Sequence, residues 1–226
     1  MESSRSFALG DIHGCFTTCK TLLEDVIQLT LNDTLYILGD YIDRGNDSKK
    51  VIDYLLDLKE AGYSLCFLRG NHEQMLLNSL NNKKKEQQWL AHGGKETLAS
   101  FGVASAQELD EKYIQFFNEL AYYVEYKEYI LVHAGLNFKI KDPFKDTHAM
   151  LWLKFMEIDR SKINNKIIIH GHTPYPTSII LSQNPKIEAD ISVDGGCVFA
   201  NKKEDLGSLI AFEMNTQTFY HQPFIG

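Results

Sequence analysis

The chain has 226 residues, of which 44% are hydrophobic and 23% are charged, and its formal net charge is −7. These values are typical of a soluble globular protein with a sizeable core, and they exclude a fibrous or disordered chain. The acidic balance disfavours duplex nucleic acid as a partner, because proteins usually meet it with a clustered basic face. The one basic run, at residues 83–85, is interpreted as a solvated loop.

The cysteines show no CxxC pair and no regular spacing. They therefore fit a reducing compartment, where thiols serve mainly as small core residues. The apolar run at residues 7–9 is too short for a signal peptide, and no stretch approaches the roughly 18 apolar residues of a membrane span. We expect a cytoplasmic protein with no membrane partner.

The first third of the chain alternates short apolar runs with segments of helical periodicity. The runs at 6–9, 34–38 and 63–68 each stop at a polar segment that contains glycine, and they predict strands. Residues 16–29 and the stretch around 51–56 carry apolar residues at helical spacing. The repeated pattern favours a largely parallel sheet covered by helices.

The rest of the chain divides into a helical part and a strand-rich part. Residues 74 to about 120 predict a helical, cap-like segment within a single domain that spans 1–226. The second set of strands is expected to be mostly antiparallel, with a hairpin at its start: its predicted strands are 122–126, 129–132, 166–169, 179–181, 187–193 and 209–212.

Polar side chains gather where these apolar strands end. In open α/β sheets, sites form at the carboxyl ends of the strands, so these side chains are expected to converge on one crevice. They are Asp11 and His13; Asp40, Asp43 and Arg44; Arg69, Asn71 and His72; His133; and His170 and His172.

The residue types indicate a metal site. Asp and Asn oxygens and His nitrogens, without a thiolate, suit Mn, Fe, Zn or Mg better than a structural zinc site. The candidate ligands outnumber those that one catalytic cation with open positions needs. Two cations roughly 3.5–4 Å apart, sharing one carboxylate, would use them all. Arg44 and Arg69 add planar guanidinium groups that match phosphate geometry.

At this point the chain resembles a known family. It is similar to the phosphoprotein phosphatase branch of the calcineurin-like metallophosphoesterases, and especially to small bacterial and phage Ser/Thr protein phosphatases and to symmetrical diadenosine tetraphosphate hydrolases. The similarity runs from about residue 6 to 212. The motifs that carry it are Gly10-Asp11-Ile12-His13-Gly14, Gly39-Asp40-Tyr41-Ile42-Asp43-Arg44-Gly45, Gly70-Asn71-His72-Glu73, His133-Ala134-Gly135 and Gly171-His172-Thr173.

The resemblance implies an α/β fold of four layers, in which two mixed β-sheets form a sandwich flanked by helices. It also implies two divalent metal ions, with Mn the leading candidate and Fe, Zn or Mg as alternatives. Asp40 would bridge the two ions. The implied metal ligands are Asp11, His13, Asp40, Asn71, His133 and His172.

The resemblance assigns catalytic roles as well. Arg44 and Arg69 would clamp the phosphate, and His72 would protonate the leaving alkoxide while Asp43 orients and charges it. Metal-activated hydroxide would attack directly and in line, so no phosphoenzyme is implied. Relatives often carry an Arg where this chain has Lys154, which leaves the role of Lys154 open.

Other residues near the motifs have plainer interpretations. His170 and His172 flank Gly171 and are hard to separate by spacing, although the family match favours His172 as the ligand and places His170 behind it. Glu73 is interpreted as a first-turn helix residue favoured by the helix dipole. Trp89 is interpreted as packing within the helical cap.

Three hypotheses about function remain open, two of them hydrolases and the third from another class. The first hypothesis is a phosphoric monoester hydrolase of the Ser/Thr protein phosphatase type, which acts on phosphoproteins or small phosphoesters. The second is a dinucleoside polyphosphate hydrolase that uses the same metals on an anhydride. The third is a binding protein that kept the fold but lost catalysis. Nuclease activity is disfavoured by the acidic balance and by the phosphatase-type motifs.

Overall fold

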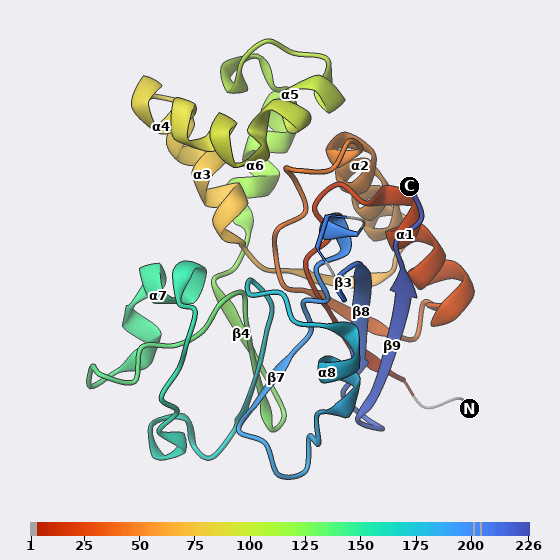
Figure 1. Ribbon diagram of the computed structural model, residues 1–226, viewed down its shortest axis with the longest axis vertical. Helices are drawn as coiled ribbons and strands as arrows, with labels where there is room; N and C mark the ends of the chain where they lie inside the picture. The colour runs from red at the N-terminus through yellow and green to blue at the C-terminus, as the bar shows by residue number, and fades with distance from the viewer. Residues whose placement is uncertain (1–3, 201, 204) are drawn as a thin grey trace.

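The computed structural model describes residues 4–200, 202–203 and 205–226 (Figure 1). Its strands are β1 (Ser6–Leu9), β2 (Thr34–Ile37), β3 (Ser64–Phe67), β4 (Tyr123–Tyr126), β5 (Tyr129–Val132), β6 (Ile167–His170), β7 (Asp190–Ser192), β8 (Ser208–Glu213) and β9 (Thr218–Pro223). Its α-helices are α1 (Phe16–Thr21), α2 (Ser48–Glu60), α3 (Asn71–Ser79), α4 (Lys83–Trp89), α5 (Lys95–Phe101), α6 (Glu111–Glu119), α7 (Thr147–Trp152) and α8 (Thr177–Ser182).

Within the described residues the strands form two mixed sheets. The first has the order β3-β2-β1-β8-β9, with β1, β2 and β3 parallel and with β8 antiparallel to both β1 and β9. The second has the order β4-β5-β6-β7, in which β4 and β5 form the predicted antiparallel hairpin while β5, β6 and β7 run parallel. The expectation of a mostly antiparallel second set was wrong, because β5, β6 and β7 are parallel and β8 belongs to the first sheet.

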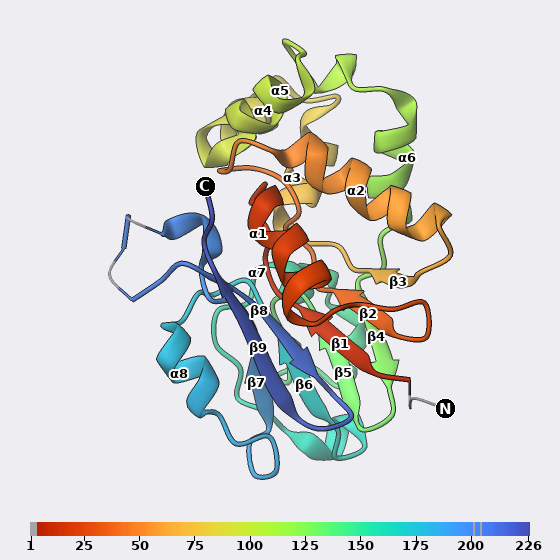
Figure 2. The same ribbon diagram turned by 90° about the vertical axis from the view of Figure 1, so that its right-hand side faces the viewer.

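Alternation along the strands builds the layers. Side chains on a strand point to opposite faces in turn. On β1, Phe7 and Leu9 pack under the helices, whereas Ala8 lies between the two sheets. On β5, Leu131 lies between the sheets and Ile130 faces outward toward the α7 side. The resulting order of layers is helices, first sheet, second sheet and outer helices (Figure 2). This order confirms the predicted four-layer α/β architecture.

The segment predicted as helical at 74 to about 120 is helical in the structure. It contains α3 to α6 and a π-helical turn at Leu90–Gly94, and it lies above the sheets in Figure 1. Its largest side chain, Trp89, is fully buried. This helical segment, the cap, therefore has a packed interior. Its interior is continuous with the hydrophobic core between the first sheet and the helices that cover it.

Two predicted elements differ from the structure. Residues 179–181 form part of α8 rather than a strand, because three consecutive apolar residues fit either element and only Ile180 of the three is buried. The predicted strand at 187–193 shortens to β7. Strand β9 was not predicted, because its edge position leaves it half-exposed and its sequence largely polar. In the part of the chain that the structure describes, no helix is long and apolar enough to cross a membrane.

Asp33 links the residue before β1 to the loop that precedes β2. Its carboxylate accepts hydrogen bonds from the backbone and guanidinium of Arg5 and from Thr30, at 2.6–3.1 Å. Burial acts to raise the pKa of Asp33, but these hydrogen bonds outweigh it and lower the pKa to about 2. Because folding lowers this pKa, the ionised carboxylate stabilises the folded protein at pH values above about 3.9, which is the pKa of Asp in the unfolded chain. This stabilisation is lost as the pH falls through 2.

We therefore expect Asp33→Asn to lower the free energy of unfolding at pH 7 by about 1–2 kcal/mol, discounted because Arg5 is partly exposed. Urea unfolding between pH 7 and pH 2 should show the difference from the parent shrinking toward the acid end. The exposed Asp25 provides a matched control, since Asp25→Asn should change little at any pH. A deficit that is the same at pH 7 and pH 2 would contradict the charge-based account.

Candidate metal centre

The two sheets bring the predicted ligands to one edge of the sandwich. Asp11 and His13 follow β1, Asp40 follows β2, Asn71 begins α3 after β3, His133 follows β5, and His172 follows β6. Strands β1, β2 and β3 are parallel, as are β5 and β6, so within each sheet these loops leave from the same end. The loops that follow these strands therefore bring the predicted ligands together at one edge of the sandwich.

The backbone of these loops is strained. Non-glycine residues with positive φ are uncommon, and they cluster at functional sites because surrounding contacts must hold them. Five candidate site residues have such angles: His13 (46°), Asp40 (51°), Asp43 (73°), Arg44 (69°) and His172 (68°). The concentration of strain in the predicted motifs is an independent sign that the fold is constrained here for a purpose other than packing.

Glu73 holds the loop after β2 in place. Its fully buried carboxylate accepts backbone N–H bonds from Asp40, Tyr41 and Gly70, each at 2.9 Å. Burial and the neighbouring Asp40 raise the pKa of Glu73 to about 8, while the hydrogen bonds favour the charged form. Glu73 thus has a structural role, as predicted, but it acts on the Asp40 loop rather than only on its own helix.

One group of ligand atoms surrounds the amide of Asn71. Its Oδ1 lies 2.9 Å from His133 Nε2 and 2.9 Å from His172 Nδ1, and Asp40 Oδ1 lies 3.6 Å from the same His133 Nε2. His133 Nδ1 donates to the carbonyl of Leu38, so Nε2 presents a lone pair toward Asn71 Oδ1. Two acceptors that face each other at 2.9 Å fit a cation bound between them.

A second group lies on the other side of Asp40. Ligand atoms of His13, Asp40 and His72 lie within 4.8 Å of one another, as do those of Asp40, His133 and His172. His13 Nδ1 donates to the carbonyl of Ile42 at 2.8 Å, which turns Nε2 toward Asp40 Oδ2 at 3.3 Å. Asp40 belongs to both groups, as expected of a bridging carboxylate.

Asp11 stands slightly apart from both groups. Its carboxylate oxygens each accept the backbone N–H of His172 at 3.2 Å, and Gly171 packs directly against them. A Cβ at position 171 would meet Asp11 Oδ1 at 2.2 Å. This close approach explains why a glycine separates the two histidines of the His170-Gly171-His172 string.

The electrostatics of the crevice favour bound cations. Burial, together with Asp194 and Asp40, raises the pKa of Asp11 well above its usual range, and burial raises that of Asp194 to about 6. Burial also lowers the pKa of His133 and of His172 to about 3, so both imidazoles are neutral and their lone pairs are free at neutral pH. Crowded carboxylates beside neutral imidazoles form a donor set that fits divalent ions.

His72 and Asp43 form the expected pair. His72 Nδ1 lies 2.6 Å from Asp43 Oδ2, and both side chains are buried. His72 Nε2 is buried with no hydrogen-bond partner among the described residues, 4.0 Å from Asp40 Oδ2. The unpartnered nitrogen is thus close to the Asp40 carboxylate.

Burial shifts the pKa values of this pair in opposite directions. It lowers the pKa of His72 to about 4 and raises the pKa of Asp43 to about 7. Because neither group readily holds a separate charge in a buried site, we expect the two to titrate as one unit. An imidazolium secured by Asp43 stays a prediction.

Sequence reasoning missed the groups that hold Asp43. Trp89 Nε1 donates to both of its carboxylate oxygens at 2.9–3.0 Å, and Thr97 Oγ1 donates to Oδ1 at 2.6 Å. Trp89 was interpreted as cap packing, and Thr97 was not singled out. No local signal links them to Asp43, which lies about fifty positions earlier. Asp194 was missed despite a signal, since it follows the strand β7 as the other polar residues follow theirs.

The two arginines have different surroundings. Arg44 Nη1 lies 2.5 Å from His13 Nε2, and its guanidinium lies over the ring of Phe199 at 5.2 Å, so it points into the crevice. Arg69 instead donates to Gln74 and Tyr122 and to the carbonyls of residues 117 and 118. These bonds occupy most of its donors and tie β3 to the end of α6, so a phosphate role for Arg69 remains a prediction.

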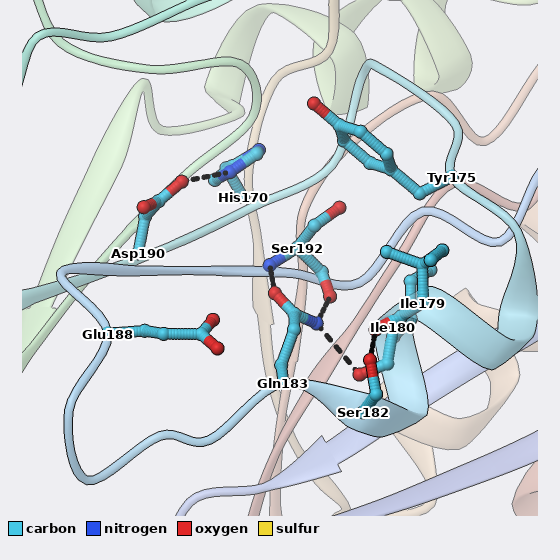
Figure 3. Close-up of a pocket in the computed structure, with 9 residues that line it drawn as sticks. All are labelled: His170, Tyr175, Ile179, Ile180, Ser182, Gln183, Glu188, Asp190 and Ser192. Carbon is cyan, nitrogen blue, oxygen red and sulfur yellow. Dashed lines mark hydrogen bonds and ion pairs between the residues drawn. The ribbon is translucent and has the colours of Figure 1, made fainter.

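His170 and His172 are separated by the structure. His172 faces Asn71, whereas His170 pairs with Asp190 through Nε2 at 3.2 Å (Figure 3). His170 lines a different cavity of about 280 Å³, together with Tyr175, Gln183 and Ser192. This arrangement favours His172 as the candidate ligand, in line with the family resemblance.

A sandwich of two mixed sheets with crowded Asp, His and Asn side chains at one edge defines a metal-dependent phosphoester hydrolase. The sequence profile of the calcineurin-like phosphoesterases matches residues 5–200, and the chain belongs to this family of metallophosphoesterases. A dinuclear divalent metal centre is characteristic of the family, and the residues present fit one.

Relatives and solved structures agree with this assignment. The chain is 25% identical, over 96% of its length and 93% of the other's, to a protein of Oceanobacillus iheyensis named asymmetrical bis(5'-nucleosyl)-tetraphosphatase PrpE. It is 30% identical, over 70% of its length, to a symmetrical bis(5'-nucleosyl)-tetraphosphatase of Wigglesworthia glossinidia brevipalpis, of which it spans 59%. A Saccharomyces cerevisiae protein serine/threonine phosphatase shares the fold, with a TM-score of 0.67 and 18% identity over 99% of this chain and 80% of the other.

Metal binding should stabilise the protein measurably. Ions that bind only the folded state at about 100 times their Kd contribute about 2.7 kcal/mol per site. For a chain of this size that corresponds to a rise in Tm of about 5–10 °C. We expect this rise when Mn is added to chelated protein, measured by scanning calorimetry. An unchanged Tm, together with no Mn retained after desalting, would contradict the placement of the metal centre.

Proposed function

We propose that the protein hydrolyses dinucleoside polyphosphates of the diadenosine tetraphosphate class. The supporting observation is that a relative which aligns over 96% of the chain is named a bis(5'-nucleosyl)-tetraphosphatase, and so is the next relative. The sequence alone placed a Ser/Thr protein phosphatase first. The relatives favour the second of those hypotheses, and the likeness to solved phosphatases shows only the fold.

The proposed ligand set combines the contacts of the site with the family resemblance. His13 and Asp40, whose ligand atoms lie together, would hold one divalent ion with Asp11, which the resemblance adds, and Asp40 would share the second ion with Asn71, His133 and His172. When bound, the two ions supply activation of water and neutralisation of phosphoryl charge. Mn is the leading candidate, and oxygen and imidazole donors of this kind also accept Fe, Zn or Mg.

The remaining residues bind the phosphate and move a proton. Arg44 binds phosphoryl oxygens from the His13 side of the crevice, where its guanidinium already lies. His72 delivers a proton from Nε2 to the departing oxygen. Asp43, which Trp89 and Thr97 hold in position, orients the imidazole through Nδ1.

A side-by-side assay tests the proposal. With Mn supplied, we expect diadenosine tetraphosphate to be turned over with a higher kcat/KM than a phosphoserine peptide or p-nitrophenyl phosphate. Chromatography of the products also identifies the cleaved bond, since symmetrical cleavage gives ADP alone and asymmetrical cleavage gives ATP and AMP. Brisk turnover of the phosphopeptide with an inert dinucleotide would reverse the order and restore the protein phosphatase.

A further inference from the structure

A cavity of about 440 Å³ opens directly beside the candidate metal centre. Arg44 forms part of its wall, and the same guanidinium contacts His13 Nε2, so the cavity and the crevice share one side chain. Gly14 and Gly45, which follow the two motifs, line it as well. A substrate held at Arg44 by one phosphate would therefore extend naturally into this space.

The cavity is lined by both apolar and polar residues. Its apolar wall consists of Phe16, Val198, Phe224 and Ile225, although Phe224 is 37% exposed and Ile225 is 41% exposed. Asn46 and Asp47 are among its polar lining residues. A ligand-sized hollow with an aromatic wall and a few polar groups suits a nucleoside, whose base stacks on aromatic rings and whose edges form hydrogen bonds.

The apolar wall is built into the fold. The backbone N–H of Phe224 donates to the carbonyl of Gly207 at 2.8 Å, and that of Ile225 donates to Thr18 Oγ1 on α1 at 2.9 Å. Both views of the chain place this segment beside the start of α1 (Figures 1 and 2). Backbone hydrogen bonds to two separate parts of the structure therefore hold the segment of Phe224 and Ile225 beside the cavity.

Cations gather at the rim of the cavity. The ring of Phe199 has Arg44 over it at 5.2 Å and Lys203 over it at 4.7 Å, and Lys202 lines the cavity itself. On a chain with a net charge of −7, this group stands out. A phosphomonoester places only one phosphate at the metal centre, whereas a polyphosphate chain extends several charges beyond it, where these lysines lie.

We propose that this cavity is a nucleoside subsite, and that Lys202 and Lys203 hold the polyphosphate that leads to it from Arg44. The inference rests on the proposed function and adds to it: the nucleoside wall and the lysines select a nucleotide over a simple phosphomonoester. The subsite acts on binding, so its residues set KM and product affinity rather than the chemical step.

Calorimetric titration of the Mn-loaded protein with ADP and with pyrophosphate tests the subsite directly. The double variant Lys202→Gln/Lys203→Gln should weaken both ligands about tenfold. Phe224→Ser should weaken ADP about tenfold and leave pyrophosphate unchanged, because only ADP carries a base. KM for diadenosine tetraphosphate should rise in parallel, with kcat and the rate on p-nitrophenyl phosphate unaffected.

Matched controls remove charge and apolar surface elsewhere. Lys84→Gln/Lys85→Gln deletes two exposed lysines from α4, and Ile187→Ser deletes a side chain that is 76% exposed, so both should behave as the parent. Equal ADP affinity in the parent and in the Lys202/Lys203 and Phe224 variants, or equal loss in the controls, overturns the subsite. A parent that binds ADP through these residues but cleaves no dinucleotide would instead overturn the proposed function and leave the subsite standing.

Discussion

Asp40→Asn is expected to lower kcat by about 10³-fold or more on diadenosine tetraphosphate and on p-nitrophenyl phosphate alike. Asp40 is the one side chain that belongs to both groups of ligand atoms. Asn keeps the size of the side chain and the acceptor for the His72 backbone N–H at 3.0 Å, but it removes the negative charge. Loss of metal-assisted charge stabilisation amounts to several kcal/mol, and each 1.36 kcal/mol is tenfold in rate.

The metal content of the Asp40→Asn variant distinguishes loss of the bridging ligand from misfolding of the chain. The variant should unfold cooperatively but should retain fewer than two Mn ions per chain by elemental analysis after desalting. Asp25→Asn is the matched control, since that carboxylate is exposed, and it should keep both the metal and the rate. Two tightly held ions together with near-parental kcat in Asp40→Asn would remove Asp40 from the bridging position.

Much of the fold could be predicted from the sequence because its signals are local. Strands β1, β2 and β3 are apolar runs that stop at glycine-containing motifs, and α2 has clear helical spacing. The errors fall where the pattern is ambiguous. The apolar stretch at 179–181 is too short to separate strand from helix, and the partly exposed edge strand β9 has little apolar character. Which sheet β8 joins depends on long-range pairing with β1, which periodicity does not reveal.

The candidate ligands could be found for a different reason. Each follows a strand, and the parallel strands of an α/β fold deliver such residues to one edge. Asp40, Asn71 and His133 were identified in this way, and the structure brings them together. The same rule applied to β7 points to Asp194, which is buried and acts on the pKa of Asp11.

The supports of these residues could not be predicted. Trp89 and Thr97 reach Asp43 from the helical cap, and their positions depend on how α4 and α5 pack rather than on any motif. Arg69 shows the same dependence on packing: its sequence context predicts a phosphate clamp, and tertiary contacts that no motif reveals occupy most of its donors. Residue type and spacing identify groups that meet at a site, whereas their hydrogen-bond partners emerge only from packing.

His72→Asn should reduce turnover in proportion to the need for a proton on the leaving group. Rates on a phosphoserine peptide, whose alkoxide leaves poorly, should fall by roughly 10²–10⁴-fold if His72 is the general acid. The loss on p-nitrophenyl phosphate should be much smaller, because its leaving group departs without protonation. The loss on diadenosine tetraphosphate should be as small as that on p-nitrophenyl phosphate, since a departing phosphate oxygen, with a pKa of about 6, is far less basic than an alkoxide.

The controls for His72 use the geometry of its pair. Asp43→Asn should reproduce the same ranking of substrates, because Asp43 orients the imidazole at 2.6 Å. His221→Asn makes the same chemical change at an exposed position on β9 and should leave all three rates near those of the parent. A loss of equal size on all three substrates would assign His72 to binding or positioning, since a proton donor must matter most where the leaving group is worst.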